Sequence, residues 1–246
     1  MRRPNQRRVD GQRRMDGQRS VLGDIYDALL AAFGPQHWWP ADTATEVVIG
    51  AILTQNTAWP NVEKAITSMK RASCLDLGRI RRMDDEELAA VIRSAGTYRS
   101  KARRLKDFAE WLFTVHDGDL AGALAGDLAQ VRQELLGIRG IGPETADAIL
   151  LYAAHHPSFV VDAYTKRILR RHHLIDAGGQ GRVGGQSGVA GSYEAVKSYF
   201  EEALPADAAL FNEYHALLVE LGKRHCRSRA ICEGCPLQGW AHDGNL

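Results

Sequence analysis

The sequence predicts an all-α fold. Apolar residues recur at helical spacing through most of the 246-residue chain, and the only strand-like stretch is Phe159-Val160-Val161. Three residues are too few to found a sheet. Because 45% of the residues are hydrophobic and 25% are charged, the chain can bury a substantial core, either as one large domain or as two small ones.

The first helix is expected between Ser20, a residue suited to the N-cap, and Gly34, a plausible stop. Apolar side chains at helical spacing occupy the residues between them. Nine further segments show the same periodicity: 45–56, 60–72, 84–95, 100–115, 128–137, 144–154, 163–171, 192–203 and 209–223. The chain is therefore expected to consist of many short helices.

Two segments are predicted to lie outside the helical core. Residues 1–20 carry seven arginines and two aspartates, a charge of +5 that leaves about −4 for the rest of a chain whose net charge is +1. This polar tail is expected to be disordered, as a solvated tail, as an overextended gene start with Met15 as the true initiator, or as a phosphate-binding arm. Residues 176–192 contain seven glycines and indicate a flexible insertion.

The strongest local signal is a tight turn between two helices. One helix is expected to end near Leu136, and Gly140-Ile141-Gly142 makes the turn before a second helix begins at Pro143. Backbone amides of such a turn, with the positive end of the next helix dipole, can bind a phosphate. An ordinary helix–turn–helix corner would also use glycines, so both interpretations remain open from these residues alone.

Several stretches together resemble the helix-hairpin-helix DNA glycosylase superfamily, of which endonuclease III is a member. They are Ile138–Ala146, the segment Phe159–Arg167 that contains Asp162, Leu53-Thr-Gln-Asn-Thr57 and Gly96–Ala102. The resemblance covers roughly residues 21–240. It implies a base-excision-repair enzyme that hydrolyses the N-glycosidic bond of a flipped base in damaged double-stranded DNA.

The resemblance places the catalytic carboxylate at Asp162. Breaking an N-glycosidic bond builds positive charge on the sugar, which a carboxylate stabilises while it orients or deprotonates the attacking water. Asp162 also suits the N-cap of the helix that follows, and both roles are compatible. Glu144 stands where bifunctional members have a nucleophilic lysine. Since a carboxylate cannot form a Schiff base, the chain is expected to have little or no lyase activity.

The DNA-binding residues implied by the resemblance are those of the turn and one glutamine. Gly140, Ile141, Gly142 and Thr145 would contact phosphates, while Gln55 would enter the duplex where the base has left. As a neutral residue of a helical segment, Gln55 could equally be a surface or core amide.

Three tryptophans predict the base pocket. Trp38-Trp39-Pro40 and Trp59 resemble the bacterial 3-methyladenine glycosylase branch of the superfamily, in which paired aromatic side chains sandwich an alkylated base. Alkylated adenine is cationic, and indole faces attract cations. The first choice of substrate is therefore an alkylated purine such as 3-methyladenine. Core packing is the alternative role for these side chains. Oxidised pyrimidines are the alternative substrate, and a catalytically silent DNA-binding protein is the alternative class.

Cys226, Cys232 and Cys235 resemble the iron–sulfur loop of the superfamily. The family's fourth cysteine corresponds to Ala241, so a [4Fe–4S] cluster would need His242 or water as its last ligand. A zinc ion held by three cysteines and a histidine, or no metal at all, are the alternatives.

The resemblance also implies the domain organisation. Residues 44–156 would form a six-helix lobe, residues 21–43 and 157–246 would form a second lobe, and DNA would lie in the cleft between them. No apolar run is long enough for a membrane span or a secretory signal, so we expect a cytoplasmic protein that has no membrane partner. We also expect a monomer.

Overall fold

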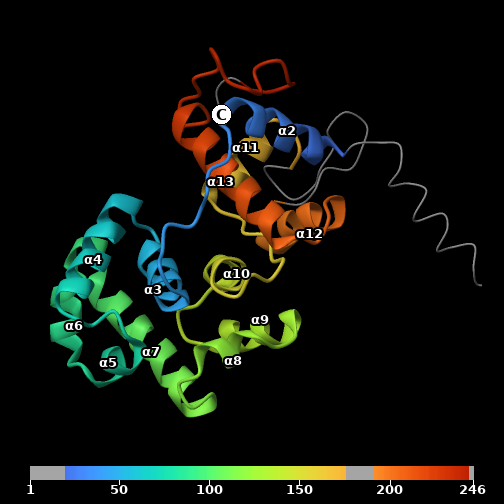
Figure 1. The fold of residues 1–246 in the computed structure, drawn as a ribbon. Helices are drawn as coiled ribbons and strands as arrows, with labels where there is room; N and C mark the ends of the chain where they lie inside the picture. The colour runs from blue at the N-terminus through green and yellow to red at the C-terminus, as the bar shows by residue number, and fades with distance from the viewer. Residues whose placement is uncertain (1–19, 176–190, 244–246) are drawn as a thin grey trace, which may run out of the picture. The chain divides into compact units, whose positions relative to one another are not determined.

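The computed structural model describes residues 20–175 and 191–243, in which every regular element is a helix and none is a β-strand (Figure 1). The all-α prediction is confirmed. The expectations for the tail 1–20 and the insertion 176–192 fall almost entirely outside the described residues. Phe159, Val160 and Val161 are buried, but they form no strand.

The chain divides into two compact units. One unit comprises His37–Asp162 and Asp207–His215, and we call it the hairpin unit because it contains the Gly140–Gly142 turn. Its helices are α3 (Ala44–Thr54), α4 (Trp59–Arg71), α5 (Leu77–Arg82), α6 (Asp85–Val91), the 3-10 turn η1 (Arg93–Ala95), α7 (Tyr98–Val115), α8 (Leu120–Leu124), α9 (Leu128–Gly137) and α10 (Pro143–Tyr152).

The second unit contains the described residues up to Gln36, Ala163–Ala206 and those from Ala216 onward. Its helices are α2 (Val21–Phe33), α11 (Ala163–Arg171) and α12 (Tyr193–Ala203), and α13 (Ala208–Arg224) contributes residues to both units. The lobe boundaries expected from the sequence remain predictions.

Helix α2 begins and ends where its sequence predicts. The Oγ of Ser20 accepts a hydrogen bond from the amide of Gly23 at 3.1 Å, and Gly34 ends the helix with a φ of +69°. A left-handed backbone of this kind favours glycine, which has no Cβ to clash. Leu22, Ile25 and Leu29 are buried on one face of the helix, as its periodicity requires.

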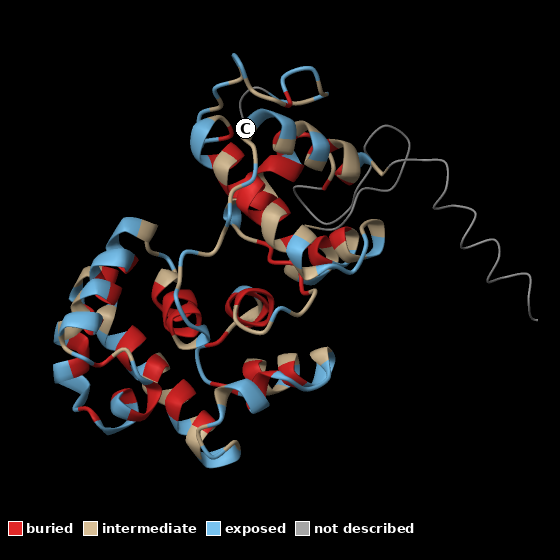
Figure 2. Ribbon diagram, viewed as in Figure 1, coloured by how far each residue is buried: buried red, intermediate tan, exposed pale blue. Residues whose placement is uncertain are grey.

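Helices α3 and α10 form the centre of the hairpin unit. They pack against each other and are buried along nearly their whole length (Figure 2). Most of their residues are apolar, and a mostly apolar helix has to be enclosed by its neighbours. Helices α4 and α7 also pack on α3, and α9 packs on α10. The two residues of interest at the ends of these helices, Gln55 and Tyr152, are thus positioned by a well-packed core.

Two short helices were not expected from the sequence. Helices α5 and α8 have six and five residues, too few for an apolar stripe to be recognised. Both begin at an aspartate whose side chain accepts a hydrogen bond from the helix backbone, Asp76 for α5 and Asp119 for α8. The expected helix 84–95 is in fact α6 followed by η1.

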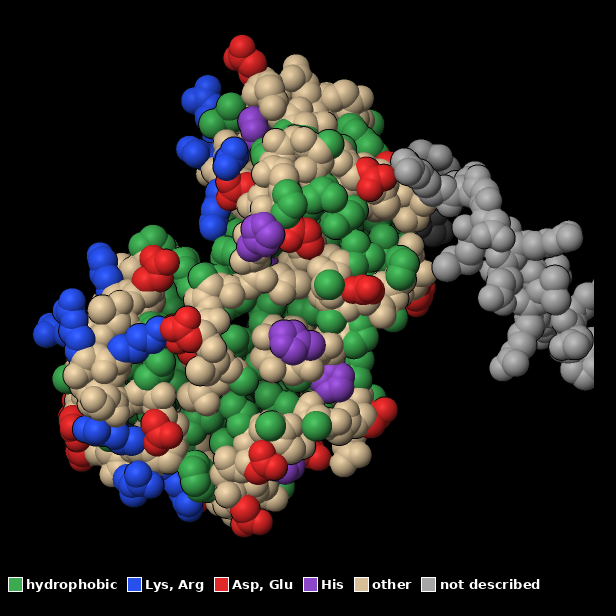
Figure 3. Space-filling view, viewed as in Figure 1, with side chains coloured by type: hydrophobic (Ala, Val, Ile, Leu, Met, Phe, Trp, Pro, Cys, Tyr) green, Lys and Arg blue, Asp and Glu red, His purple; other side chains and the backbone are tan. Residues whose placement is uncertain are grey.

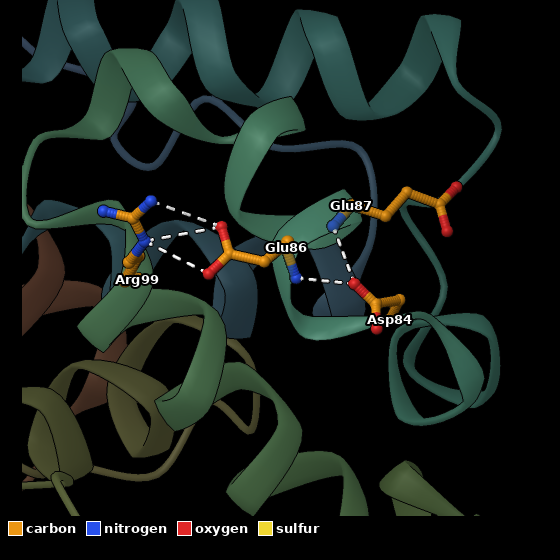
Figure 4. Close-up of polar contacts among 4 residues, drawn as sticks. All are labelled: Asp84, Glu86, Glu87 and Arg99. Carbon is orange, nitrogen blue, oxygen red and sulfur yellow. Dashed lines mark hydrogen bonds and ion pairs between the residues drawn. The ribbon is translucent and has the colours of Figure 1, made fainter.

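The start of α6 shows the same type of cap (Figure 4). The carboxylate of Asp84 accepts hydrogen bonds from the amides of Glu86 at 2.9 Å and Glu87 at 3.3 Å. Arg99 of α7 pairs with the Glu86 side chain at 3.2 Å, which joins the two helices at the surface. Because this pair is exposed, its contribution to stability is small.

On the face that Figure 3 shows, Lys and Arg side chains are interspersed with Asp and Glu. A polyanion such as DNA would be attracted to such a surface by individual Lys and Arg side chains and not by a uniformly positive potential. No helix of the described residues is long and apolar enough to cross a membrane.

Candidate active site

The predicted hairpin is present between α9 and α10. Ile138 and Ile141 are 6% and 5% exposed and anchor the turn in the core, while Gly140 lies at the surface. Gly142 is the N-cap of α10 and Pro143 is its first residue, as the sequence predicts. No side chain caps this helix, so its first amides face a position where an anion would be favourable.

The two glycines of the turn are under different constraints. Gly140 has a φ of +86°, and a Cβ added there would lie 2.6 Å from Cγ of Arg104 on α7. Gly142 has an extended backbone and open space around its Cα. Only Gly140 therefore requires glycine for steric reasons.

Gln55 lies against the hairpin. Its Nε2 donates to the carbonyl oxygen of Gly140 at 3.1 Å and to Oγ1 of Thr145 at 2.8 Å, and Arg104 donates to its Oε1. Gln55 thus joins the end of α3 to the hairpin and to α7. The entry of Gln55 into a duplex, and the phosphate contacts of the hairpin residues, remain predictions.

A buried lysine holds the loop that carries Gln55. The ammonium of Lys101 is fully buried and donates to the carbonyl of Leu53 at 2.8 Å, the hydroxyl of Thr57 at 2.5 Å and the carbonyl of Ala95 at 2.6 Å. Burial lowers the pKa of Lys101 to about 8, and the nearby Arg104 cation adds to this effect. The ammonium still predominates at pH 7 and supplies three donors to three acceptors.

Trp38, Trp39 and Trp59 form one cluster, as the base-pocket prediction requires. Ring centroids of Trp38 and Trp59 are 6.0 Å apart with planes tilted by 48°, and Trp39 meets Trp59 edge-on at 4.9 Å. A base held between two parallel rings needs ring planes about 7 Å apart, which is twice a normal carbon–carbon contact. The three indoles pack on one another here, so Trp38 and Trp59 have to separate before a base can enter.

Trp39 connects this cluster to α3 and α10. Its indole lies over Gly50, where a Cβ would be 3.3 Å from Cζ2 of the tryptophan, and its ring centroid is 4.9 Å from that of Tyr152. Trp39 is half-buried and packs on α3 and α10 through these contacts, in addition to its contact with Trp59.

Asp162 lies beside a histidine that the sequence did not predict to be functional. Its side chain is 14% exposed, and its Oδ2 is 3.7 Å from Nε2 of His215, which is on α13. The other ring nitrogen of His215 is hydrogen-bonded to the hydroxyl of Tyr152. Burial raises the pKa of the Tyr152 hydroxyl well above its ordinary value, and the Asp162 carboxylate raises it further.

These contacts join the candidate pocket to the candidate catalytic group. Trp39 contacts Tyr152, Tyr152 binds His215, and His215 faces Asp162, all within the hairpin unit. The arrangement combines aromatic surfaces with a mostly buried carboxylate, and the hairpin lies in the same unit. A carboxylate in such an environment can stabilise positive charge that develops on a sugar.

Comparison with known families decides the assignment. The model of the HhH-GPD superfamily of base excision DNA repair proteins matches residues 49–182, which include the hairpin and Asp162. The chain belongs to the HhH-GPD superfamily. A protein of Methanocaldococcus jannaschii whose name assigns it to the DNA repair glycosylases is 44% identical over 219 residues, which are 89% of this chain and 94% of the relative. The protein is thus a DNA glycosylase of the base-excision-repair type.

Solved HhH-GPD structures agree with this family. The 3-methyladenine DNA glycosylase of H. pylori, bound to 1,N6-ethenoadenine, is 26% identical and has a TM-score of 0.66 over 82% of this chain and 96% of its own. A non-covalent endonuclease III–DNA complex has a TM-score of 0.75 at 21% identity, over 93% of this chain and 97% of its own, and shows the shared fold. Among sequence relatives, endonuclease III of Sulfolobus acidocaldarius is 28% identical over 78% of this chain and 79% of its own.

The cysteine segment, residues 225–242, is held by helix α11 of the second unit. The guanidinium of Arg171 donates to Sγ of Cys226 at 2.9 Å and to the carbonyl of Arg227 at 3.0 Å. Arg167 donates to the carbonyl of Cys226 at 2.7 Å, and His172 is hydrogen-bonded to the carbonyl of Ala241. The segment is therefore ordered by arginine and histidine side chains.

The metal sites that the sequence suggested for the cysteine segment remain predictions. Cys226, Cys232, Cys235 and His242 line one pocket, and among the described residues no group of three or more His, Cys, Asp or Glu is close enough to hold a metal ion in this arrangement. Arg171 donates a hydrogen bond to the sulfur of Cys226, and Ala241 stands at the position of the family's fourth cysteine. Burial raises the pKa of the Cys235 thiol, and the neighbouring cysteines add to this effect. His242 binds the carbonyl of Trp240 through Nδ1.

Four residues of the site were not expected from the sequence to have a role: Lys101, Arg104, Tyr152 and His215. Lys101 lies in a stretch that resembles the family, which was the only signal available for it. Tyr152 and His215 are 63 residues apart and lie on helices whose apolar periodicity explains them equally well as core residues. No sequence spacing predicts their contact.

Proposed function

We propose that this HhH-GPD glycosylase is monofunctional and removes alkylated purines such as 3-methyladenine. The observation that carries the proposal is the cluster of Trp38, Trp39 and Trp59, connected through Tyr152 and His215 to Asp162. The likeness to the H. pylori 3-methyladenine glycosylase supports it. We further propose that the enzyme acts as a cytoplasmic monomer on double-stranded DNA.

The chemistry of the base explains why tryptophans would select it. Alkylation of adenine at N3 gives the ring a positive charge, and each cation–π contact with an indole is worth about 0.5–2 kcal/mol. Normal adenine is neutral and gains none of this energy. The charged base also leaves the sugar readily, so the enzyme needs chiefly to stabilise the positive charge of the sugar, which is the role proposed for Asp162.

The monofunctional part of the proposal rests on the residue at the start of α10. Glu144 is exposed in the first turn of this helix, at the position of the nucleophilic lysine of bifunctional members. Lys101, whose lowered pKa would suit a nucleophile, is fully buried and binds three oxygens. It is therefore inaccessible to a sugar aldehyde.

The proposal is tested with a panel of duplexes that each carry one lesion. The enzyme is incubated with methylated, thymine-glycol and uracil duplexes, and free base is measured by chromatography together with strand breaks after hot alkali. We expect release of 3-methyladenine, with breaks appearing only after alkali. Release from thymine glycol alone would replace the proposal with the oxidised-pyrimidine function that the endonuclease III relatives favour. Binding without any release would identify a silent DNA-binding protein.

Variants of the pocket and of the carboxylate sharpen this test. Trp59→Ala should slow release of 3-methyladenine at least tenfold, equivalent to about 1.4 kcal/mol. Trp111→Ala is the matched control, because Trp111 packs on Phe108 and His116 instead.

Asp162→Asn should abolish release while leaving duplex affinity nearly unchanged, and retention of most of the single-turnover rate would exclude Asp162 as the catalytic group.

The absence of lyase chemistry has its own test. Borohydride should trap no covalent adduct between the wild-type enzyme and abasic DNA, since no accessible amine occupies the position of Glu144. Glu144→Lys is the converse variant, and a gain of trapped adduct would place this position beside the sugar. A strong adduct with the wild type would contradict the monofunctional proposal.

A further inference from the structure

A buried histidine connects two side chains of the candidate site. His215 is 6% exposed, its Nδ1 is hydrogen-bonded to the hydroxyl of Tyr152, and its Nε2 is 3.7 Å from Oδ2 of Asp162. The three residues come from α10, from the segment before α11 and from α13, and all belong to the hairpin unit. Nε2 itself is buried and forms no hydrogen bond with any described residue.

Both neighbours of the imidazole favour the same tautomer. Tyr152 keeps its proton at neutral pH, because burial raises the pKa of its hydroxyl well above the ordinary value. The hydroxyl can therefore donate to Nδ1, which places the ring proton on Nε2. This N–H then faces the carboxylate of Asp162. The opposite tautomer would direct a lone pair of Nε2 at a negatively charged oxygen.

We propose that His215 is a positioning residue for Asp162, with its Nε2–H directed at Oδ2 and its own orientation fixed by Tyr152. This inference rests on the catalytic role proposed for Asp162. The 3.7 Å separation exceeds the 2.7–3.2 Å of a typical N–H···O hydrogen bond, so the contact is electrostatic in the structure. It becomes a direct bond after a shift of about half an ångström, of the kind that occurs when catalytic contacts tighten around a substrate.

A neutral donor suits this position better than a cation. The carboxylate acts by stabilising positive charge on the sugar, and a lysine or arginine beside it would neutralise the charge on which this effect depends. A neutral imidazole restrains one oxygen of Asp162 and leaves the net negative charge of the group intact. The absence of another acceptor for Nε2 among the described residues keeps its proton available for Asp162.

Two substitutions separate the functions of the two ring nitrogens. In His215→Gln the side-chain amide can reach the position of Nε2 and donate to Asp162, whereas in His215→Asn it reaches only the position of Nδ1. We measure single-turnover base release on the panel duplex that the wild type processes fastest, and affinity for a duplex with an uncleavable abasic analogue. We expect His215→Asn to be slower by at least about tenfold, equivalent to 1.36 kcal/mol, and His215→Gln to retain most of the rate.

Both variants should bind the abasic duplex as the wild type does, because only the orientation of Asp162 changes. Tyr152→Phe removes the donor to Nδ1 and should slow base release less than His215→Asn. Equal rates for the Asn and Gln variants, whether near that of the wild type or equally reduced, would overturn the proposal and leave His215 with a purely structural role.

A measurement on the wild-type protein does not depend on how the variants fold. Nitrogen NMR of protein labelled with ¹⁵N-histidine should show His215 protonated at Nε2 and unprotonated at Nδ1 at pH 7. A ring protonated at Nδ1 alone would overturn the proposal. The same experiments distinguish failure of this inference from failure of the proposed function. If the Asp162→Asn enzyme still releases base, the catalytic role proposed for Asp162 is wrong. An inactive Asp162→Asn enzyme together with a fully active His215→Asn enzyme would refute only the role of His215.

Discussion

The hairpin and the cysteine segment are both held in place by side chains from other parts of the chain, but those side chains bind different atoms. Gln55 binds the hairpin through a carbonyl oxygen and the hydroxyl of Thr145, and the first amides of α10 have no side-chain cap. In the cysteine segment, Arg171 binds the sulfur of Cys226 itself. The candidate phosphate-binding amides thus have no side-chain cap, whereas one of the candidate metal ligands is hydrogen-bonded to Arg171.

This difference separates a motif that works through its backbone from one that works through its side chains. A hairpin functions when its turn has the right shape, which Gly140 and the isoleucine anchors provide. A metal site needs a complete set of ligands at one point, and with Ala241 in place of the family's fourth cysteine the last ligand has to come from His242 or water. The following predictions test this contrast, beginning with the largest expected effect.

Lys101→Met tests how strongly the hairpin region depends on its buried ammonium. The substitution leaves the carbonyls of Leu53 and Ala95 without this donor, at a cost of about 1–3 kcal/mol for each group. We expect the free energy of unfolding, measured by urea denaturation at pH 7, to fall by about 2–5 kcal/mol. An unchanged midpoint would mean that water replaces the lysine.

The stability difference between the wild type and Lys101→Met should also depend on pH. The pKa of Lys101 is about 8 in the folded protein and 10.5 as its ordinary value. Between these two values the unfolded chain binds more protons, so the free energy of unfolding contributed by this group rises with pH. The difference in stability between the wild type and Lys101→Met should therefore grow from pH 8 to pH 10. A difference that is independent of pH would contradict the lowered pKa.

Arg171→Met tests what orders the cysteine segment. Arg171 is buried and donates to one sulfur and to the carbonyls of Arg227 and Ser228. Its loss should lower the free energy of unfolding by about 1.5–3 kcal/mol, as expected for bonds to a charged group. Cys232→Ser is the matched control, with an expected change of about 0.5 kcal/mol or less. A larger effect of the cysteine would indicate that a thiolate ligand holds the segment.

Gly140→Val tests the shape of the hairpin. A β-branched residue at a φ of +86° is strained, and its Cβ would meet Arg104 at 2.6 Å. Affinity for undamaged and damaged duplexes alike should fall at least about tenfold, or 1.4 kcal/mol, by fluorescence anisotropy at fixed salt. Gly142→Ala, at an unstrained and open position, should change the affinity by less than about twofold. A loss confined to lesion DNA would show that the turn shapes the base pocket.

Ala241→Cys should have the smallest effect on base release and a clear effect on composition. Wild-type protein purified without oxygen is expected to be colourless, with iron and sulfide well below one cluster per chain. After reconstitution with iron and sulfide, the variant should retain more of both than the wild type, with broad visible absorbance. Brown wild-type protein with equal iron and sulfide would show that the segment binds a [4Fe–4S] cluster after rearrangement.

The sequence determined the all-α class, the ends of α2 and the position of the hairpin. These features follow from local rules, since periodicity, caps and turn glycines act over a few residues: Ser20 and Gly34 bound α2, and Pro143 begins α10. The same local rules did not predict α5 and α8, because helices of six and five residues are too short to show a recognisable apolar periodicity. The resemblance that identified Asp162 also depended on contiguous residues.

The tertiary structure alone decided how the site is assembled. Gly140 needs to be glycine because its φ is +86° and Arg104 of α7 lies beside it, whereas neither constraint applies to Gly142. The contacts of Tyr152 with His215, and of His215 with Asp162, join residues from three separate segments, and hydrogen bonds between buried groups require no particular spacing along the chain. The sequence shows which chemical groups are present, but only packing determines which of them meet and whether, as with Cys226, another side chain has already bound them.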